Sequence, residues 1–598
     1  MCGIVAYIGN NTKEKIINSL KKLEYRGYDS CGIAYFDKDD IKTKKVSGKI
    51  LELEKELNSI DVFSPCIAHT RWATHGKPSV ENAHPHHSNN NMWFVVHNGI
   101  IENYSQLKNE ELNGFNFYSQ TDTETIPNLC SLFGNNLVAF YKAVSLLEGS
   151  FAIAGINKNE KKIYLSKKNA PLFVCKHNDE IICSSDIICF EKGSEYFELK
   201  DGEFAEILDN RKIIFYDKNL NEIKKKSMTI KQDIQDANLD TFEHHTIKEI
   251  FETPKVYDKL IKKYKNSSEL SNLDKLEFNK IKLIGCGSAY HTALVGAMYL
   301  EQKLKIETNC YIASEFKYSN PIIDSKTLCI FISQSGETAD TLACVDLVKN
   351  HHGLIVSITN TTRSSLARKS KIVLDMQAGI EIGVATTKAF NAGVIVLYIL
   401  ANYLKNKKIP FSNIKKLKAE TENILGSLDK IKHIALLLKN VEKAFFIGRN
   451  IDYMIAQEGC LKLKEISYIN CSSFPSGELK HGTLALIEKG VYCFAISTNK
   501  DLQLKNFSNF QEIVARQGEI IYIGSNNIPP FETNNKLLFN HISADLDVLL
   551  AVTIMQLIAY YTTINKGYNP DQPRNLAKSV TVEWIFSNID RSINRSFE

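Results

Sequence analysis

An internal repeat in the second half of the chain is the feature that most constrains its fold. A set of glycine, small, aromatic and apolar residues occurs twice at one constant offset, as Ile284-Gly285, Tyr290, Ala293, Gly296 and Leu300 and again as Ile447-Gly448, Tyr453, Ala456, Gly459 and Leu463. Glu315-Phe316-Lys317 recurs at the same offset as Glu478-Leu479-Lys480. Each copy begins with an apolar stretch, turns at a glycine and continues as a helical pattern, which is typical of a doubly wound parallel sheet. We therefore predict two α/β subdomains, at 243–425 and 426–583.

The composition is that of a globular protein with room for one more domain. The chain has 598 residues, of which 44% are hydrophobic and 24% charged, and its net charge is +5. This length predicts about three domains, and the small charge gives no indication of a nucleic-acid partner. The 14 cysteines show no paired spacing and no secretory signal is visible, so we expect a cytoplasmic protein with reduced thiols. The longest apolar stretch, 549–561, predicts a buried helix rather than a membrane segment.

The first part of the chain has a different pattern from the repeat. Short β-rich segments at 3–8, 32–36, 94–97, 151–156 and 163–166 alternate with turns and two helical stretches. This pattern predicts an α+β domain with packed sheets over residues 2–220. A polar, lysine-rich segment follows, so we place a linker at 221–242. Residues 584–598 form a C-terminal extension, either a surface tail or a segment whose aromatic start packs near a site.

Cys2 is the first candidate for chemistry. Removal of Met1, which is expected when the next side chain is small, would leave a thiol and a free α-amine on one residue. The amine titrates near pH ~8 and the thiol near ~8.5, so the amine can take up the thiol proton without a distant histidine. Any residue can follow Met1, and Cys2 by itself is therefore only a candidate nucleophile.

Other residues could assist such a nucleophile. Asn98-Gly99 follows an apolar stretch and could offer a side-chain amide and a backbone N–H to an oxyanion, although Asn-Gly alone would simply mark a turn. Arg71 could bind a carboxylate with two hydrogen bonds, and Asp122 could receive an ammonium group. Taken singly, Arg71 and Asp122 are better explained as surface or structural charges.

Taken together, these residues resemble the class II, or N-terminal-nucleophile, glutamine amidotransferase family. The matching motifs occur in the family's order: Cys2-Gly3-Ile4, Tyr25 to Ser30, Thr70 to Gly76, His97-Asn98-Gly99 and Thr121 to Glu124. The resemblance implies a layered αββα domain in which Cys2 attacks the amide of L-glutamine, Asn98 and Gly99 form the oxyanion hole, and ammonia is released. It implies the following glutamine-binding residues: Arg71, Trp72, Thr74, His75 and Asp122. Trp72 would also gate a passage for ammonia, with a packed core tryptophan as the alternative.

The turn Ser333-Gln334-Ser335-Gly336-Glu337-Thr338 indicates a second centre. It follows an apolar stretch and precedes a helical one, so its hydroxyls and N–H groups could bind a phosphate, although such a turn is often only a helix cap. The second copy has Ser497-Thr498-Asn499 instead, which predicts one phosphate site for two subdomains. The turn after Gly285 lacks the third glycine of a dinucleotide fingerprint, which disfavours NAD.

Lysine and acidic side chains suited to isomerisation come later. Lys462 and Glu465 lie one helical turn apart, a spacing that suits a proton relay or an ordinary ion pair. With the segments 381–390, 477–482 and 571–583, they resemble the paired sugar-isomerase (SIS) domains of the isomerizing glutamine:fructose-6-phosphate aminotransferase family. The resemblance covers nearly the whole chain. It implies that L-glutamine and fructose 6-phosphate become glutamate and glucosamine 6-phosphate, without a metal or organic cofactor.

By that resemblance, roles follow for individual residues. Lys578 would form an imine with the open-chain sugar, Glu465 would move a proton between carbons 1 and 2, and Lys462 would support that transfer. His481 would assist ring opening from another copy, which implies a homodimer. The implied sugar-phosphate ligands are Ser288, Ser333, Gln334, Ser335, Thr338, Val384, Thr386 and Ala577.

The chain departs from that family in a few places, and some alternatives stay open. Ala289 stands where the family usually has a second hydroxyl, which predicts phosphate binding weaker by about 1 kcal/mol. Thr386 replaces a serine and keeps the hydroxyl. Other class II amidotransferases need a phosphoribosyl or ATP loop, and neither is visible. A paralogous isomerase or a sugar-phosphate sensor remains, but a sensor would not need Cys2, His481 and Lys578 together.

Overall fold

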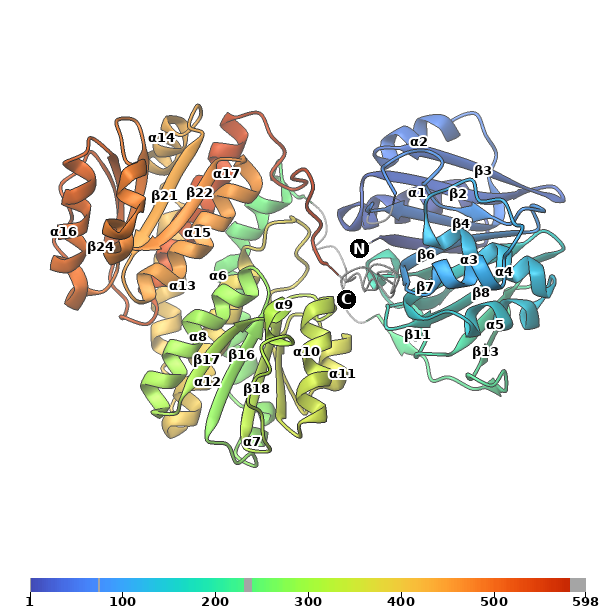
Figure 1. The fold of residues 1–598 in the computed structure, drawn as a ribbon, viewed down its shortest axis with the longest axis horizontal. Coiled ribbons are helices and arrows are strands. Elements are labelled where there is room, and N and C mark those ends of the chain that lie inside the picture. The colour runs from blue at the N-terminus through green and yellow to red at the C-terminus, as the bar shows by residue number, and fades with distance from the viewer. Residues whose placement is uncertain (1, 74–75, 231–238, 581–598) are drawn as a thin grey trace, which may run out of the picture. The chain divides into compact units, whose positions relative to one another are not determined.

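The computed structural model describes residues 2–73, 76–230 and 239–580. The chain divides into two compact units, Met1–Ala237 with Ala577–Glu598, and Asn238–Leu576 (Figure 1). The first unit contains the Cys2 segment, and the second contains both copies of the repeat.

Two antiparallel sheets form the first unit. The first sheet has the strand order β15-β11-β9-β10-β1-β4-β2-β3, and the second has the order β14-β13-β12-β8-β7-β6-β5. The strands of the first sheet are β1 (Gly3–Ile8), β2 (Ser30–Asp37), β3 (Asp40–Ser47), β4 (Phe63–Arg71), β9 (Phe173–His177), β10 (Glu180–Ser184), β11 (Glu195–Glu198) and β15 (Met228–Thr229). Those of the second are β5 (His86–His87), β6 (Trp93–Ile101), β7 (Gly149–Asn157), β8 (Glu160–Lys168), β12 (Phe204–Leu208), β13 (Ile213–Tyr216) and β14 (Glu222–Ile223).

Alternating side chains build the core between these sheets. Ile4, Ala6 and Ile8 of β1 lie in one buried cluster with Val96 of β6 and Leu165 of β8, because every second residue of a strand faces the same side. Helices α1 (Thr12–Leu23) and α2 (Ile50–Leu57) pack on the first sheet, and α4 (Thr125–Phe133) and α5 (Leu137–Ser145) pack on the second; α3 (Tyr104–Glu110) packs on α4. The layers are helices, sheet, sheet and helices, so the predicted αββα fold is confirmed.

The first unit extends past residue 220, where the sequence places the start of a linker. β14 pairs with β13, and β15 pairs with β11, so the chain adds two short edge strands before it leaves the sheets. Each is two residues long and lies in a lysine-rich segment. Such strands carry no apolar alternation, which is the signal that predicts a strand from sequence.

The second unit contains two parallel five-stranded sheets with the same connectivity. Their strand orders are β17-β16-β18-β19-β20 and β22-β21-β23-β24-β25. The first comprises β16 (Lys280–Gly285), β17 (Thr308–Ile312), β18 (Thr327–Ser333), β19 (Leu354–Thr359) and β20 (Ile372–Asp375); the second comprises β21 (Lys443–Gly448), β22 (Asn470–Pro475), β23 (Tyr492–Ser497), β24 (Glu519–Ser525) and β25 (Asn535–Phe539). In such an order the crevice for a ligand lies between the first and third strands, at their carboxyl ends. The predicted pair of doubly wound subdomains is confirmed.

Helices between the sheets give the two subdomains one shared core. Apolar residues of α8, α12, α15 and α17 belong to a single buried cluster that also includes strand residues of both sheets. The helices of this unit are α6 (His245–Tyr264), α7 (Ser268–Leu273), α8 (Ser288–Leu304), α9 (Ala313–Phe316), α10 (Ala339–Asn350), α11 (Ser365–Lys369), α12 (Lys388–Asn406), α13 (Phe411–Leu425), α14 (Asp429–Leu437), α15 (Ile451–Ser467), α16 (Gln503–Val514) and α17 (Asp547–Asn565). Among the described residues, α17 is the one helix long and apolar enough to cross a membrane, and 89% of its apolar window is buried in the protein.

Candidate functional site

Pairing of β1 with β4 positions Cys2. Gly3 lies opposite Thr70, and its N–H donates to the Thr70 hydroxyl at 3.1 Å. The Trp72 N–H, just beyond the end of β4, donates to the Cys2 sulfur at 3.3 Å. Burial raises the pKa of the Cys2 thiol, so at neutral pH this thiol needs a base to become a nucleophile.

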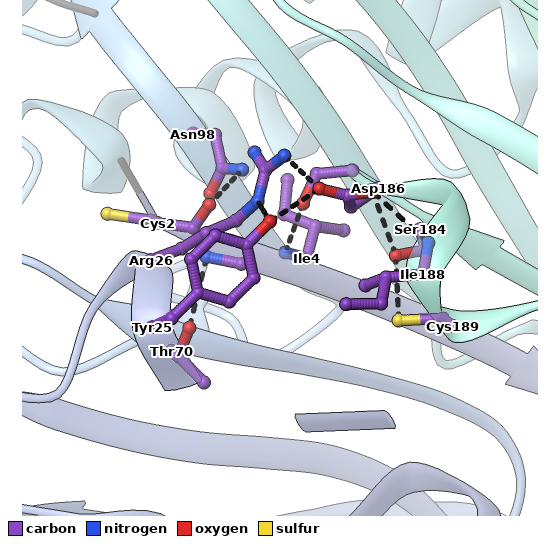
Figure 2. A network of polar contacts seen from close by, with 12 residues as sticks. Cys2, Ile4, Tyr25, Arg26, Thr70, Asn98, Ser184, Asp186, Ile188 and Cys189 are labelled. Atoms are coloured by element: carbon purple, nitrogen blue, oxygen red, sulfur yellow. Dashed lines mark hydrogen bonds and ion pairs between the residues drawn. The ribbon is translucent and has the colours of Figure 1, made fainter. Parts of the chain in front are cut away.

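Asn98 lies directly against Cys2 (Figure 2). Its amide nitrogen donates to the Cys2 carbonyl at 2.8 Å, and its amide oxygen lies 3.0 Å from Nε2 of His69. The same Nε2 is 3.0 Å from the carbonyl of His97, so it faces two acceptors and must carry the proton. His69 therefore fixes which way the Asn98 amide points, with its N–H₂ group toward Cys2.

Gly99 follows with φ +128°, a conformation that favours glycine. A Cβ there would lie 1.9 Å from the carbonyl oxygen of Ser150 on β7. The structure thus brings Asn98 of β6 to Cys2, with Gly99 as the next residue of the same strand.

The two charged candidates of this centre are both buried. Arg71 donates to the carbonyls of Gly76 and Lys77 at 3.2 and 3.5 Å. Asp122 accepts the N–H of Ile101 at 2.7 Å, which fixes its carboxylate beside the end of β6. Burial lowers the pKa of Arg71, while its interactions with Cys2 and Asp122 oppose that shift. Arg71, Asp122 and Cys2 are therefore within electrostatic range of one another.

Trp72 is held by the segment before β2. Gly27 approaches so closely that a Cβ would lie 2.6 Å from the Trp72 nitrogen. Asp29 accepts the Ala73 N–H at 2.8 Å, and the Tyr28 and Trp72 rings meet edge to face at 5.4 Å. The predicted glutamine ligands Thr74 and His75 lie outside the described residues.

A charged cluster of Tyr25, Arg26 and Asp186 lies next to β1, the strand that follows Cys2. Tyr25 and Arg26 both bind the carboxylate of Asp186, with the Tyr25 hydroxyl donating at 2.6 Å and Arg26 forming a buried ion pair (Figure 2). Beside Asp186, the Ser185 hydroxyl accepts the Ile4 N–H at 3.0 Å. The motif from Tyr25 to Ser30 therefore contributes structure to this centre.

Four buried histidines surround the Asn98 side of the site: His69, His84, His86 and His97. The rings of His69 and His84 stack at 4.1 Å, and the Thr123 hydroxyl lies 2.9 Å from both His84 and His97. Burial lowers the pKa of His69 to about 3 and also lowers the pKa of the other three histidines. All four are therefore neutral near pH 7. Among the described residues, no group of three or more His, Cys, Asp or Glu side chains is arranged to hold a metal ion.

In the second unit, one face of α15 carries a ladder of charges. Lys462 lies 3.3 Å from Glu458 and also pairs with Glu465. Its ammonium donates to the Ser288 hydroxyl of α8 at 3.1 Å, and that hydroxyl donates to Glu458 at 2.9 Å. His291, also on α8, binds the second oxygen of Glu458 at 2.8 Å. The structure therefore places Ser288 with the proton-transfer candidates, between the two subdomains.

Burial disfavours the charged forms of Glu458 and Lys462, but the ion pair between them outweighs this effect. Although burial opposes ionisation, Lys462 holds the pKa of Glu458 below its usual value. Glu458 and Glu465 in turn raise the pKa of Lys462. Sequence reasoning missed Glu458 and His291. The signal for Glu458 was its position four residues before Lys462, on the same helical face.

The serine-rich turn lies after β18, at the predicted crevice. The hydroxyls of Ser333 and Thr338 are 3.0 Å apart, and Ser333 accepts the Gly336 N–H at 3.0 Å. Gly336 has φ +67°, and a Cβ there would overlap Ser364. Gln334 and Ser335 belong to the same turn. After β16, the Cys286 sulfur lies 4.0 Å from the Thr341 hydroxyl of α10.

The loop before α12 contains the predicted sugar ligands Val384 and Thr386. Val384 is buried and its N–H donates to the Asp571 carbonyl at 3.1 Å. The Asp571 carboxylate accepts the N–H groups of His245 and Thr246 at 2.8 and 2.7 Å, at the start of α6. Asp571 is thus the cap of α6 and the neighbour of this loop, a role that sequence reasoning did not find.

Three remaining candidates are on other segments of the chain. Ala577 and Lys578 belong to the first unit, because the second ends at Leu576. His481 ends the short helix Ser476–His481 and is exposed in a single chain.

Known proteins match both units. A family model described as a glutamine amidotransferase domain matches residues 69–192, and one described as an SIS domain matches 277–403 and 437–565. Proteins named glutamine–fructose-6-phosphate aminotransferase (isomerizing) from Staphylococcus aureus and Clostridium acetobutylicum are each 39% identical over 604 and 609 residues, covering 98% of this chain and 100% of their own. The solved C-terminal domain of glucosamine-fructose-6-phosphate aminotransferase from Francisella tularensis has a TM-score of 0.53 and 32% identity, and covers 56% of this chain and 100% of its own.

Proposed function

The chain belongs to the glutamine–fructose-6-phosphate aminotransferase (isomerizing) family, and from this premise we propose that it converts L-glutamine and D-fructose 6-phosphate to L-glutamate and D-glucosamine 6-phosphate. The observation that carries the proposal is the presence in one chain of two clusters of reactive side chains. One has a partly buried thiol beside an oriented amide, and the other has a buried lysine between two carboxylates.

In the first centre Cys2 is the nucleophile. After removal of Met1, the Cys2 amine takes the thiol proton, and the sulfur attacks the side-chain carbonyl of glutamine. The Asn98 N–H₂ group and the Gly99 N–H stabilise the oxyanion. The carbon–nitrogen bond then breaks, ammonia leaves with the proton, and water hydrolyses the thioester to glutamate. Arg71 and Asp122 bind the α-carboxylate and α-ammonium of glutamine, with Trp72, Thr74 and His75 completing that site.

In the second centre the sugar is aminated and isomerised. Lys578 forms an imine at carbon 2 of the open-chain sugar, and ammonia displaces the lysine. Glu465 then removes a proton from carbon 1 and returns one to carbon 2, so a ketose imine becomes an amino aldose without any net oxidation. Lys462 supports this transfer, which its hydrogen bond to Ser288 and its pairing with Glu458 and Glu465 favour. The turn from Ser333 to Thr338 binds the phosphate, and Val384, Thr386 and Ala577 line the sugar.

The finer parts of the proposal concern transfer and assembly. Ammonia passes from the first centre to the second without release to water, where it would be protonated, and Trp72 gates its passage. The enzyme is a cytoplasmic homodimer in which His481 of one copy opens the sugar ring bound by another. Exposure of His481 in a single chain supports this assembly.

The test compares the native chain with Cys2→Ala. Glucosamine 6-phosphate formation from fructose 6-phosphate is measured with L-glutamine or with an ammonium salt as the nitrogen source. We expect the native chain to use both and the variant to use only ammonium. If neither protein makes the amino sugar with either source while fructose 6-phosphate still binds, the proposed reaction is wrong and a sugar-phosphate sensor takes its place.

A further inference from the structure

The two subdomains begin their first helix in the same way. Gly287 before α8 has φ 55° and ψ −127°, and Asn450 before α15 has φ 56° and ψ −122°. The second residue of each helix is therefore at an equivalent place, Ala289 in the first subdomain and Asp452 in the second. Strand register agrees, because Ile281 pairs with Leu328 as Ala444 pairs with Tyr492. Each helix thus begins beside the loop after the third strand of its sheet, 333–338 or 497–502.

In the second subdomain a carboxylate already occupies this place. Asp452 is fully buried, and its two oxygens accept the Thr498 N–H at 3.1 and 3.2 Å. The Thr498 hydroxyl donates to the same carboxylate at 2.6 Å. These are the donors that an anion would use at a helix start and a strand end. Burial raises the pKa of Asp452 to about 7, while the hydrogen bonds from Thr498 act against that shift.

In the first subdomain the equivalent place holds only the methyl group of Ala289. A methyl group has no acceptor for the N–H groups of the 333–338 loop. That loop has hydroxyls at Ser333 and Thr338, and its glycine at 336 allows close approach. The same architecture therefore has an acceptor group supplied by the protein in one subdomain, and in the other this place is left to a ligand.

We propose that the residue at this helix position decides which subdomain takes the sugar phosphate, with the Asp452 carboxyl group occupying the place of the phosphate in the second subdomain and so excluding it. The proposal rests on the proposed function, since it concerns the phosphate of that substrate. The proposal also gives Ala289 a second role. Its missing hydroxyl removes one hydrogen bond to the phosphate, but its small side chain leaves room for the phosphate at the start of α8. A purely local role for Asp452, in fixing the 497–502 loop, makes no prediction about the first subdomain.

The first test moves the carboxylate into the first subdomain with Ala289→Asp. We expect fructose 6-phosphate binding, measured by titration calorimetry, to weaken by about 100-fold or more, because the new carboxylate repels the phosphate and competes for its donors. Ala289→Asn is the matched control, of the same size but neutral, and should lose about tenfold or less. Thermal unfolding without ligand checks that both variants are folded. Binding by Ala289→Asp within about threefold of the native chain overturns the proposal.

The second test removes the carboxylate from the second subdomain with Asp452→Ala. Inorganic phosphate is titrated, and we expect one ion bound per native chain and two per variant chain. Asp452→Asn, which keeps the place filled, should bind one. A single phosphate in a folded Asp452→Ala chain overturns the proposal, and if that variant does not fold, the Ala289 pair decides.

Failure of the inference can be separated from failure of the proposed function. A native chain that binds neither fructose 6-phosphate nor phosphate contradicts the proposed function itself. A native chain that binds one fructose 6-phosphate, with Ala289→Asp binding it equally well, contradicts only the role of this helix position.

Discussion

On the Asn98 side of Cys2 the buried histidines are neutral, whereas around Lys462 the buried side chains are charged. Four histidines with lowered pKa values lie on the Asn98 side of the first centre, and the two acceptors facing His69 place its proton on Nε2. In the second centre Lys462 and Glu458 stay ionised although both are buried. The difference follows the proposed chemistry. An oxyanion needs fixed N–H donors that do not exchange protons, whereas isomerisation needs an acid and a base whose charges are held ready.

Removing a charge from the second centre should have the largest effect. Glu458→Ala leaves Lys462 without its fully buried partner, and we expect the free energy of unfolding to fall by about 3–5 kcal/mol. Far-ultraviolet circular dichroism during urea unfolding measures this loss. Glu458→Gln is the control, since it keeps the shape and the bond to Ser288, and it should cost about 1–3 kcal/mol. Equal stability of all three proteins would mean that the charge ladder contributes nothing to this centre.

Removing a neutral group from the first centre should change rate more than stability. His69→Ala frees the Asn98 amide to turn, so we expect kcat for glutamine hydrolysis to fall about 10- to 100-fold with little change in KM, as for loss of an oxyanion donor. Synthesis from ammonium should be unchanged. His177→Ala, a histidine substitution outside the cluster, is the matched control. A kcat within about twofold of the native value would show that Asn98 does not depend on His69.

Acidification should destabilise the two centres at different pH values, and the change in the free energy of unfolding per residue should be smaller than for Glu458→Ala. The pKa of His69 is about 3 in the folded chain and ~6.5 when unfolded, so between these values the unfolded state binds the extra proton and stability falls as pH falls. Between pH 7.5 and 5.5 this amounts to about 1.4 kcal/mol for His69. The lowered pKa of Glu458 means that its contribution is lost only below its unfolded value of ~4.5.

Tryptophan fluorescence can report this difference, because both tryptophans among the described residues, Trp72 and Trp93, lie in the first unit. We expect urea midpoints followed by fluorescence to fall between pH 7.5 and 5.5, and to fall less in a His69→Asn variant. Identical pH dependence in the two proteins would contradict a neutral, buried His69.

Much of the fold could be predicted because its signals are local or repeated. The repeated glycine turns at Gly285 and Gly448 predict two parallel sheets, and the short apolar segments at the start of the chain predict a domain with packed sheets. The Cys2 centre could also be assembled from short motifs. The contact of His69 with Asn98 was not predictable, because nothing in the residues from 69 to 98 encodes which ring nitrogen faces which amide.

The second centre was less predictable because it is built across the repeat. Glu458 could have been found from its spacing to Lys462, but His291 reaches Glu458 from 167 residues away, through packing of α8 on α15. Asp452 was hidden for a similar reason. Its equivalence to Ala289 follows from the repeat, yet the bond to Thr498 depends on how a helix start meets the end of another strand.

The cap that Asp571 supplies to α6 also has a consequence for the order of synthesis. Thr246 emerges from the ribosome 325 residues before the carboxylate that binds its N–H. At typical rates of translation, this interval is about 15–65 s. During that time α6 begins with two N–H groups that lack their native acceptor. The first helix of the second unit thus receives its N-terminal cap only from the last stretch of that unit, after almost all of the chain has been made. The two antiparallel sheets of the first unit, whose last strand ends at Thr229, can already have folded by then.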